Sequence, residues 1–299
     1  MTAKAVLFAS LVLLCLYFAV RWLMLERRRP DAGGASDATG LAGWMPTRAH
    51  VAVGFVTNFF DMLGIGSFAT TTSLFKLSRV VDDDDIPGTL NVGDTFPTLA
   101  EALISIALVT VEMKTLVSMI AASVAGAYLG AGVVARWPKR KIQIGMGVLL
   151  LAAAVIIAVR QLALVPGGTA IGVDGIALAA AVAGNFVLGA LMTLGIGLFA
   201  PCMILISVLG MDPKTAFPVM MGSCAFLMPV ASLRFIGSRR YDLRASLGLT
   251  LGGVPAVLIA AYIVKSLPLQ AVQWLVVVVV IYTAVAMLRS AVRARSAKA

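Results

Sequence analysis

The sequence is poor in charge, histidine and cysteine. Charged residues make up 13% of the chain, whereas about a quarter of a soluble domain is charged. The single histidine, His50, excludes a metal site made of several histidines. The three cysteines, Cys15, Cys202 and Cys224, all lie in apolar runs, so we expect no disulfide framework. These scarcities argue against a soluble or disulfide-linked domain.

Long apolar runs are what the chain has in abundance. Hydrophobic residues make up 60% of it, and several runs are nearly or wholly uncharged. They cover residues 5–20, 115–135, 142–159, 175–210, 247–264 and 271–288. A membrane-spanning helix needs about 20 such residues, whereas a β-barrel would show short alternating segments. The sequence therefore predicts an all-α polytopic membrane protein.

The net charge of +10 points to membrane topology rather than to nucleic acid. Positive residues of a membrane protein gather in its cytoplasmic loops. Residues 1–25 form the first predicted transmembrane helix, and they lack a clear small-x-small cleavage site. The arginines at 27–29 come directly after this helix. We therefore expect the N-terminus outside and the Gly- and Ala-rich linker 26–48 in the cytoplasm.

The chain repeats itself at the offset that separates Gly64 from Gly195, which is 195 − 64 = 131 residues. The first-half positions that match are Phe55, Val56, Leu63, Gly64, Ile65, Gly66, Phe68, Ala69 and Leu74. Their second-half counterparts are Phe186, Val187, Leu194, Gly195, Ile196, Gly197, Phe199, Ala200 and Leu205. This repetition predicts two halves at 49–160 and 175–290, with a linker at 161–174 and a cytoplasmic tail at 291–299.

The basic loops indicate how the halves are oriented. Positive residues cluster at 136–141, at 238–244 and in the tail, and the positive-inside rule places all of them in the cytoplasm. This requires that 49–78 and 175–210 each enter the membrane and return on the same side. An unbroken helix over the second of these segments would also be about 54 Å long, well beyond a hydrocarbon core of ~30 Å. Inverted halves with broken helices predict a secondary transporter.

A Gly-x-Gly pair lies at the predicted turn of each hairpin: Gly64 with Gly66, and Gly195 with Gly197. Glycine lets the chain reverse and lets a ligand approach the backbone. The half-helix after the turn would present free N–H groups to an anion. Close helix packing by small residues is the alternative, and the matched positions favour the anion site.

Further substrate-binding candidates are the hydroxyls after the first turn, two polar islands inside the predicted spans, and one intramembrane arginine. The hydroxyls are Thr70 and Thr71, the islands supply Gly93, Thr95, Gly222, Ser223 and Cys224, and the arginine is Arg234. Hydroxyl and thiol groups can donate to an oxyanion, and a guanidinium can hold one with two parallel donors. A hydroxyl can instead bond back to its own helix, which is the structural alternative.

Three acidic residues in the predicted spans, Asp61, Asp94 and Glu101, are candidates for a coupling proton. Charges inside a membrane are costly and are functional candidates for that reason. Glu101 and Arg234 lie in corresponding spans, so an ion pair between them is the alternative. The sequence indicates no metal site and no cofactor.

The motifs "FDMLGIG", "LMTLGIGLFAPCMILISVLGMDP" and "IPGTLNVGDTFPT" resemble the sulfite exporter TauE/SafE family of membrane transporters over about 49–290. The resemblance implies a carrier of anions such as sulfite, sulfonates and sulfoacetate in a bacterial inner membrane. The tip glycines and polar islands would then be the substrate region. Gly-Ile-Gly stands here where many relatives carry a longer glycine run. The implied partners are the lipid bilayer and a small anion, with a homo-oligomer left open.

Other classes stay open from the sequence alone. A rhomboid-like protease needs a Ser–His dyad, and Ser67 comes directly after Gly66, but His50 at the start of that segment is the one histidine. A prenyltransferase needs two spaced acidic motifs, and the aspartates at 82–85 have no second motif to match them. A passive anion channel can also be built from re-entrant pairs.

Overall fold

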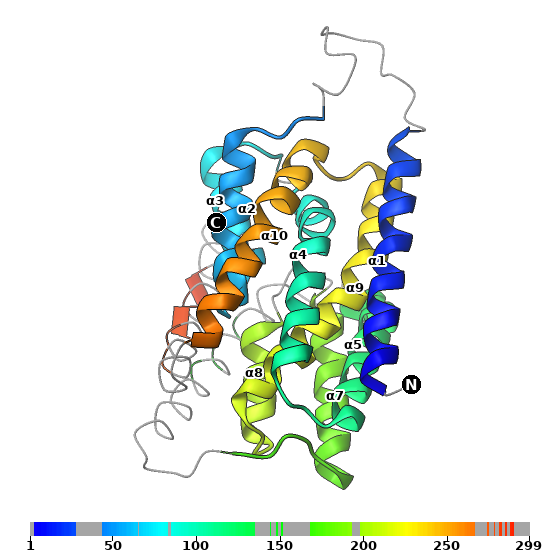
Figure 1. The fold of residues 1–299 in the computed structure, drawn as a ribbon, viewed down its shortest axis with the longest axis vertical. Helices are drawn as coiled ribbons and strands as arrows, with labels where there is room; N and C mark the ends of the chain where they lie inside the picture. The colour runs from blue at the N-terminus through cyan, green and yellow to red at the C-terminus, as the bar shows by residue number, and fades with distance from the viewer. Residues whose placement is uncertain are drawn as a thin grey trace, which may run out of the picture. The chain divides into compact units, whose positions relative to one another are not determined.

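The computed structural model describes residues 3–27, 44–64, 66–82, 85–134, 168–192 and 198–266, together with isolated positions within 144–151 and 274–289 (Figure 1). Its helices are α1 (Ala3–Arg27), α2 (Arg48–Met62), α3 (Ser67–Ser78), α4 (Ile86–Leu108), α5 (Met113–Val134), α7 (Gly175–Met192), α8 (Phe199–Val208), the 3-10 turn η2 (Pro213–Thr215), α9 (Ala216–Ser238) and α10 (Leu243–Ser266). Apart from a β-bridge between Ala170 and Met211, regular structure in these ranges is helical. This confirms the all-α prediction.

Four helices within these ranges are long and apolar enough to cross a membrane. They are Ala3–Arg27, Gly175–Met192, Pro213–Ser238 and Leu243–Ile263. A shorter apolar helix covers Met113–Leu129. The predicted runs at 142–159 and 271–288 lie largely outside the described residues. The helices agree with a multi-pass membrane protein.

The first predicted hairpin is broken at its Gly-x-Gly pair. Helix α2 ends at Met62 and α3 begins at Ser67, and between them Gly64 and Gly66 have φ angles of +96° and +77°. A residue with a β-carbon is strained at such angles, which is why glycine occupies both positions. The break therefore falls where the sequence places the turn.

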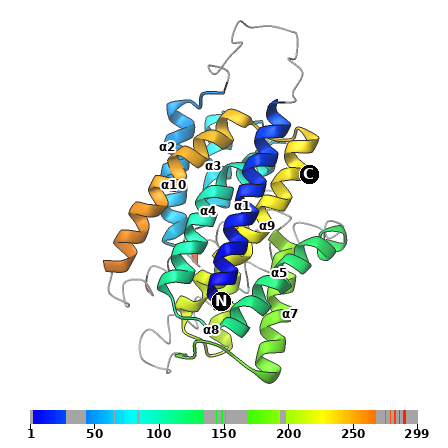
Figure 2. The same ribbon diagram turned by 45° about the vertical axis from the view of Figure 1, so that its right-hand side comes forward.

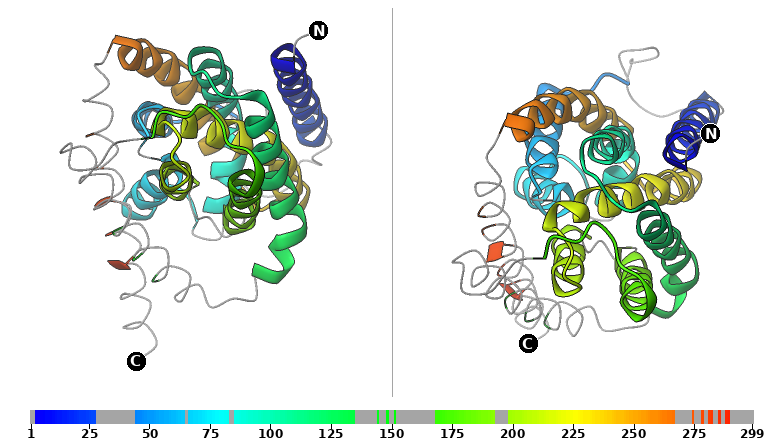
Figure 3. Two further views of the ribbon diagram at one scale, coloured as in Figure 1. Left: turned by 90° about the horizontal axis from the view of Figure 1, so that it is seen from below. Right: turned by 60° about the horizontal axis from the view of Figure 1, so that its bottom comes forward.

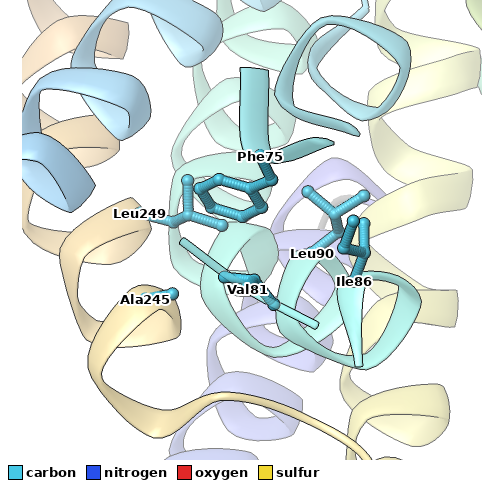
Figure 4. Close-up of a cluster of buried hydrophobic side chains, with 6 residues drawn as sticks. All are labelled: Phe75, Val81, Ile86, Leu90, Ala245 and Leu249. Atoms are coloured by element: carbon cyan, nitrogen blue, oxygen red, sulfur yellow. The ribbon is translucent and has the colours of Figure 1, made fainter. Parts of the chain in front are cut away.

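Beyond this turn the chain reverses, and α2 and α3 lie side by side (Figure 1). Phe75, near the end of α3, belongs to a buried cluster with residues of α4 and α10 (Figure 4). Val53, near the start of α2, packs against the same cluster. The far ends of the two helices therefore meet, as in a hairpin.

The second predicted hairpin is also two helices, α7 and α8. The side chain of Leu205 on α8 packs against Gly184 on α7. Gly195 and Gly197, at the predicted turn, lie outside the described residues.

The chain divides into two compact units. Unit 1 comprises Met1–Met62, Gly66–Ile104 and Cys224–Ala261. Unit 2 comprises Leu63–Ile65, Ser105–Ser223 and Tyr262–Ala299. Each unit therefore takes segments from both of the predicted halves, which remain a prediction from the sequence.

In unit 1, α1 packs against α4 and α9 through Phe18 and Trp22 (Figure 2). The Trp22 Nε1–H donates to the Tyr241 hydroxyl at 3.1 Å, and that hydroxyl donates to Glu26. The end of α1 therefore lies beside the basic 238–244 loop.

Glycines bring helix backbones into contact within each unit. In unit 1, a β-carbon at Gly252 of α10 would lie 2.1 Å from the Val51 carbonyl oxygen of α2. In unit 2, α5 and α7 lie side by side (Figure 3), and a β-carbon at Gly126 would lie 1.9 Å from the Phe186 carbonyl oxygen. Such contacts are the close packing by small residues that membrane helices use.

Pro97 interrupts the hydrogen bonding of α4. Proline has no N–H, so the Gly93 carbonyl four residues earlier loses its helical partner. The Thr250 hydroxyl of α10 donates to this carbonyl at 2.7 Å. Thr250, which is 157 residues from Gly93, thereby supplies the donor that the Gly93 carbonyl lacks at the proline.

We predict that Thr250→Val lowers the free energy of unfolding by about 1–3 kcal/mol, because it leaves a buried carbonyl without a donor. The matched control is Thr57→Val. The Thr57 hydroxyl donates at 2.8 Å to the Val53 carbonyl of its own helix. This carbonyl keeps its helical N–H donor when the hydroxyl is removed. The measurement is a denaturant titration in detergent micelles. Equal losses for the two variants would contradict the role given to Thr250.

Candidate functional site

A buried amide–carboxylate pair joins α2 and α4 in unit 1. The Asn58 side-chain N–H group donates to Asp94 Oδ1 at 3.0 Å and to the Gly54 carbonyl at 2.9 Å. Asn58 and Asp94 are both 0% exposed. Asp94 is one of the predicted coupling residues. Asn58 was missed by the sequence analysis, although a lone amide in an apolar helix was a signal that could have found it.

Ser67 links a second predicted acid, Asp61, to the same site. Ser67 is the first residue of α3 and comes directly after the Gly66 turn. Its hydroxyl and its backbone N–H are within hydrogen-bonding reach of Asp61, and the hydroxyl also reaches Asp94. The carboxylate of Asp61 therefore lies at the N-terminus of a half-helix, which is the end that favours negative charge.

Glu101, the third predicted acid, is 0% exposed, and neither of its carboxylate oxygens has a hydrogen-bond partner. The charges close enough to act on it are Asp61 and Asp94. The three acids predicted from the sequence are thus brought together in unit 1, on α2 and α4.

Further oxygens of unit 1 are buried without a hydrogen-bond partner among the described residues. They are Asn58 Oδ1 and Asp94 Oδ2 of the amide–carboxylate pair, and Thr71 Oγ1 on α3. Buried polar atoms in folded proteins are nearly always hydrogen-bonded, so a group of unpaired oxygens calls for an explanation such as a bound proton, ion or water. Among the described residues, no group of three or more acidic, histidine or cysteine side chains is arranged to hold a metal ion.

The remaining first-half candidates make local contacts. The Thr70 hydroxyl donates to the Gly66 carbonyl at 3.0 Å, and the Thr95 hydroxyl donates to the Asn91 carbonyl at 2.7 Å. Thr70 therefore adopts the structural alternative, in which a hydroxyl bonds to its own segment. The Thr95 hydroxyl also lies 3.2 Å from the Ser232 hydroxyl of α9, so it joins two helices as well. A β-carbon at Gly93 would meet the Leu249 side chain at 2.8 Å, so Gly93 serves helix packing. Around Gly66, by contrast, there is nothing within 4 Å of where a β-carbon would be.

Unit 2 holds a second amide site, without an acid. The Asn185 side-chain N–H group donates to the Met119 carbonyl at 2.7 Å and to the Ser223 hydroxyl oxygen at 3.3 Å. Ser223 in turn donates to the Val219 carbonyl at 2.7 Å. A β-carbon at the neighbouring Gly222 would meet the Ile120 side chain at 2.6 Å.

Two further candidates are more accessible to their surroundings. Cys224 is half-buried and Arg234 is exposed. Neither carboxylate oxygen of Glu101 has a hydrogen-bond partner among the described residues, so the ion pair between Glu101 and Arg234 is not formed.

Helices long enough to span a membrane, a broken hairpin and buried acids are features of a polytopic membrane protein. The chain belongs to the sulfite exporter TauE/SafE family, whose model matches residues 1–157. The matched region includes α1 and the three buried acids Asp61, Asp94 and Glu101. No curated protein and no solved structure matches the chain.

Membership of this family makes the protein a membrane transporter rather than an enzyme. Family membership therefore excludes the protease and the prenyltransferase that were considered from the sequence. The family match covers the first predicted half and the N-terminal helix, whereas the motif resemblance covered about 49–290.

Proposed function

We propose that this protein is a secondary active transporter that moves a small sulfur-containing oxyanion or organosulfonate across a bacterial cytoplasmic membrane. It works by alternating access, with a proton as the coupling ion. The observation that carries the proposal is the group of buried acids beside the break between α2 and α3. The family description, sulfite exporter, supports the class of substrate.

Paired helix contacts support the inverted repeat. Under the 131-residue offset, α2 corresponds to α7 and α5 corresponds to α10. In unit 1, α2 contacts α10 through Gly252, and in unit 2, α7 contacts α5 through Gly126. The first helix of each hairpin, α2 or α7, thus packs through a glycine on a helix of the other half. These two partner helices, α10 and α5, correspond to each other under the offset.

The two amide sites support different roles for the two repeats, one in binding the proton and the other in binding the anion. Asn58 binds Asp94 in unit 1, and Asn185 binds Ser223 in unit 2. Asp94 and Ser223 occupy the matched polar islands of the two halves. A carboxylate suits a proton and repels an anion, so we assign the coupling proton to Asp61, Asp94 and Glu101. The anion is assigned to the turn glycines and the neutral island of the second half.

The orientation is proposed from charge. The end of α1 lies beside the basic 238–244 loop. We place this end of unit 1, together with the C-terminus, in the cytoplasm, and the N-terminus outside.

The experiment is uptake into proteoliposomes that hold the purified protein. Radiolabelled sulfite and thiosulfate are the probes, with unlabelled sulfoacetate and taurine as competitors. A carrier gives saturable uptake and counterflow, in which unlabelled substrate inside drives entry of label from outside. Uptake without saturation or counterflow would indicate a channel, and no uptake of any probe would reject the proposed substrate class.

A further inference from the structure

His50, the single histidine of the chain, closes a reciprocal cap at the start of α2. Thr47 comes directly before the first residue of this helix, and its carbonyl accepts a hydrogen bond from the Val51 N–H at 3.2 Å. The His50 backbone N–H donates to the Thr47 hydroxyl oxygen at 3.3 Å, and the Thr47 backbone N–H donates to His50 Nδ1 at 3.4 Å. This is the arrangement of a capping box, with histidine in the place that glutamate or glutamine usually takes.

The cap fixes the protonation state of the imidazole. His50 Nδ1 accepts a hydrogen bond from the Thr47 N–H, so Nδ1 carries no proton and the proton of the neutral ring is on Nε2. A proton added to Nδ1 would point at the Thr47 N–H and break this bond. The positive end of the helix dipole also disfavours a cation in the first turn. The reciprocal cap therefore requires a neutral His50.

Two charged groups face His50 from the start of α10. Asp242 would attract a positive imidazole, whereas Arg244 would repel it. Both have other partners, because the Asp242 carboxylate accepts a backbone N–H of the first turn of α10 at 2.7 Å and the Arg244 Nε–H donates to the Met45 carbonyl at 2.9 Å. On α2 itself, Arg48 is two residues away. Since His50 is 6% exposed, a positive charge on its ring is poorly compensated.

The cap lies on the same stripe of α2 as the candidate site. His50, Gly54 and Asn58 are spaced four residues apart, and Asp61 follows three residues later, so the four positions share one face of the helix. Asn58 donates to Asp94 on α4, as described above. A movement of the first turn of α2 therefore acts on the helix that holds two residues of the site.

The α10 backbone contacts this stripe at three levels. A β-carbon at Gly248 would lie 2.4 Å from His50 Cβ, and a β-carbon at Gly253 would lie 2.8 Å from the Asn58 amide nitrogen. Between them, a β-carbon at Gly54 would lie 2.6 Å from an α-carbon of α10. Because the two helices are this close, His50 cannot leave α10 without moving the first turn of α2.

We propose that His50 is a pH-sensitive cap: its neutral imidazole holds the first turn of α2 on α10, and its protonation opens the cap and slows transport. One proton binds to Nδ1, and the hydrogen bond from the Thr47 N–H is lost. The pH that acts is the cytoplasmic one, because the linker 26–48 before α2 is predicted to be cytoplasmic. The proposal concerns regulation and goes beyond the proposed function, and only its transport test rests on that function.

The first test needs no substrate. NMR of protein with ¹⁵N-labelled histidine, purified without a histidine tag, reports on one imidazole, and we expect the neutral ring to carry its proton on Nε2. The resistance of the wild type to denaturant should fall as the pH drops through the pKa of this ring, because the cap binds the neutral form and stabilises the fold only at higher pH.

His50→Gln is the matched control, because a glutamine oxygen can accept from the Thr47 N–H at every pH. The loss of denaturant resistance at low pH should be absent in this variant. His50→Ala, which removes the acceptor, should be less resistant than His50→Gln at high and low pH alike. A proton on Nδ1 of the neutral ring, or the same loss at low pH in His50→Gln as in the wild type, would overturn the cap.

The second test is exchange of radiolabelled thiosulfate in proteoliposomes at equal pH inside and outside, which needs no proton gradient. The neutral fraction of a histidine falls about tenfold between one pH unit above its pKa and one unit below. Wild-type exchange should fall by up to about this factor across the range, and exchange by His50→Gln should fall by less. An equal fall in both proteins would overturn the regulatory role. Exchange that fails for every probe, while the first test finds the pH-sensitive cap, would reject the proposed function and leave the cap in place.

Discussion

Gly189→Ala should strongly destabilise the α5–α7 pair of unit 2. A β-carbon at this position would lie 2.0 Å from the Ser123 carbonyl oxygen, so the backbone of one helix would have to move. Overpacking a core with extra methyl groups typically costs about 1–3 kcal/mol, and a clash with backbone belongs at or above the upper end of that range. The measurement is the free energy of unfolding in a detergent titration monitored by circular dichroism.

Gly237→Ala is the matched control for this substitution. Gly237 lies in the last turns of α9, and nothing is within 4 Å of where its β-carbon would be. Alanine is a better helix former than glycine by about 1 kcal/mol, so the control should be neutral or slightly stabilising. A Gly189→Ala variant as stable as Gly237→Ala would show that the α5–α7 backbones are not in contact.

Asn58→Leu should cause the second large effect, a loss of both stability and transport. It removes the amide that donates to Asp94 Oδ1 and leaves a fully buried carboxyl group without that donor. Leaving a buried acceptor without its donor costs about 1–3 kcal/mol, and more where the acceptor is charged. Unfolding titration and thiosulfate accumulation measure the two losses.

Asn185→Leu in unit 2 provides the comparison, because its amide donates to the neutral acceptors Ser223 Oγ and the Met119 carbonyl. Removing a donor from neutral acceptors costs about 1–3 kcal/mol, which is less than for a charged one. The double variant Asn58→Leu with Asp94→Leu should recover part of the stability, since no buried charge remains. Equal losses at Asn58 and Asn185, with no recovery in the double variant, would mean that Asp94 is not ionised in the folded protein.

The sequence predicted which glycines break the first hairpin, but it did not predict which glycines lie at contacts between helix backbones. The break at Gly64 and Gly66 could be predicted, because two glycines in an apolar run mark a local change of backbone direction. Nothing local distinguishes them from Gly126 and Gly189, which are small so that a neighbouring helix can approach. This packing role depends on which helix lies opposite the glycine, and the sequence alone does not reveal that neighbour.

The same limit applies to the polar residues. Asp61, Asp94 and Glu101 could be identified because charge inside an apolar run is rare and costly. The contacts of Thr70 and Thr95 could not be predicted: Thr70 bonds within its own segment, whereas Thr95 bonds both to Asn91 of its own helix and to Ser232 of α9. Arg234 lies within the candidate span Pro213–Ser238, and its side chain is exposed, which the sequence alone did not indicate.

Composition and residue spacing determined the all-α membrane class, the position of the first helix break, the family, and the three acids that the fold buries. The tertiary structure alone decided the pairing of residues that lie far apart along the chain. Asn58 and its acceptor Asp94 are 36 residues apart, and Thr250 and the Gly93 carbonyl are 157 apart. Propensity and hydropathy act over a few turns of helix, whereas the pairing of a buried donor with its acceptor is set by which helices pack together.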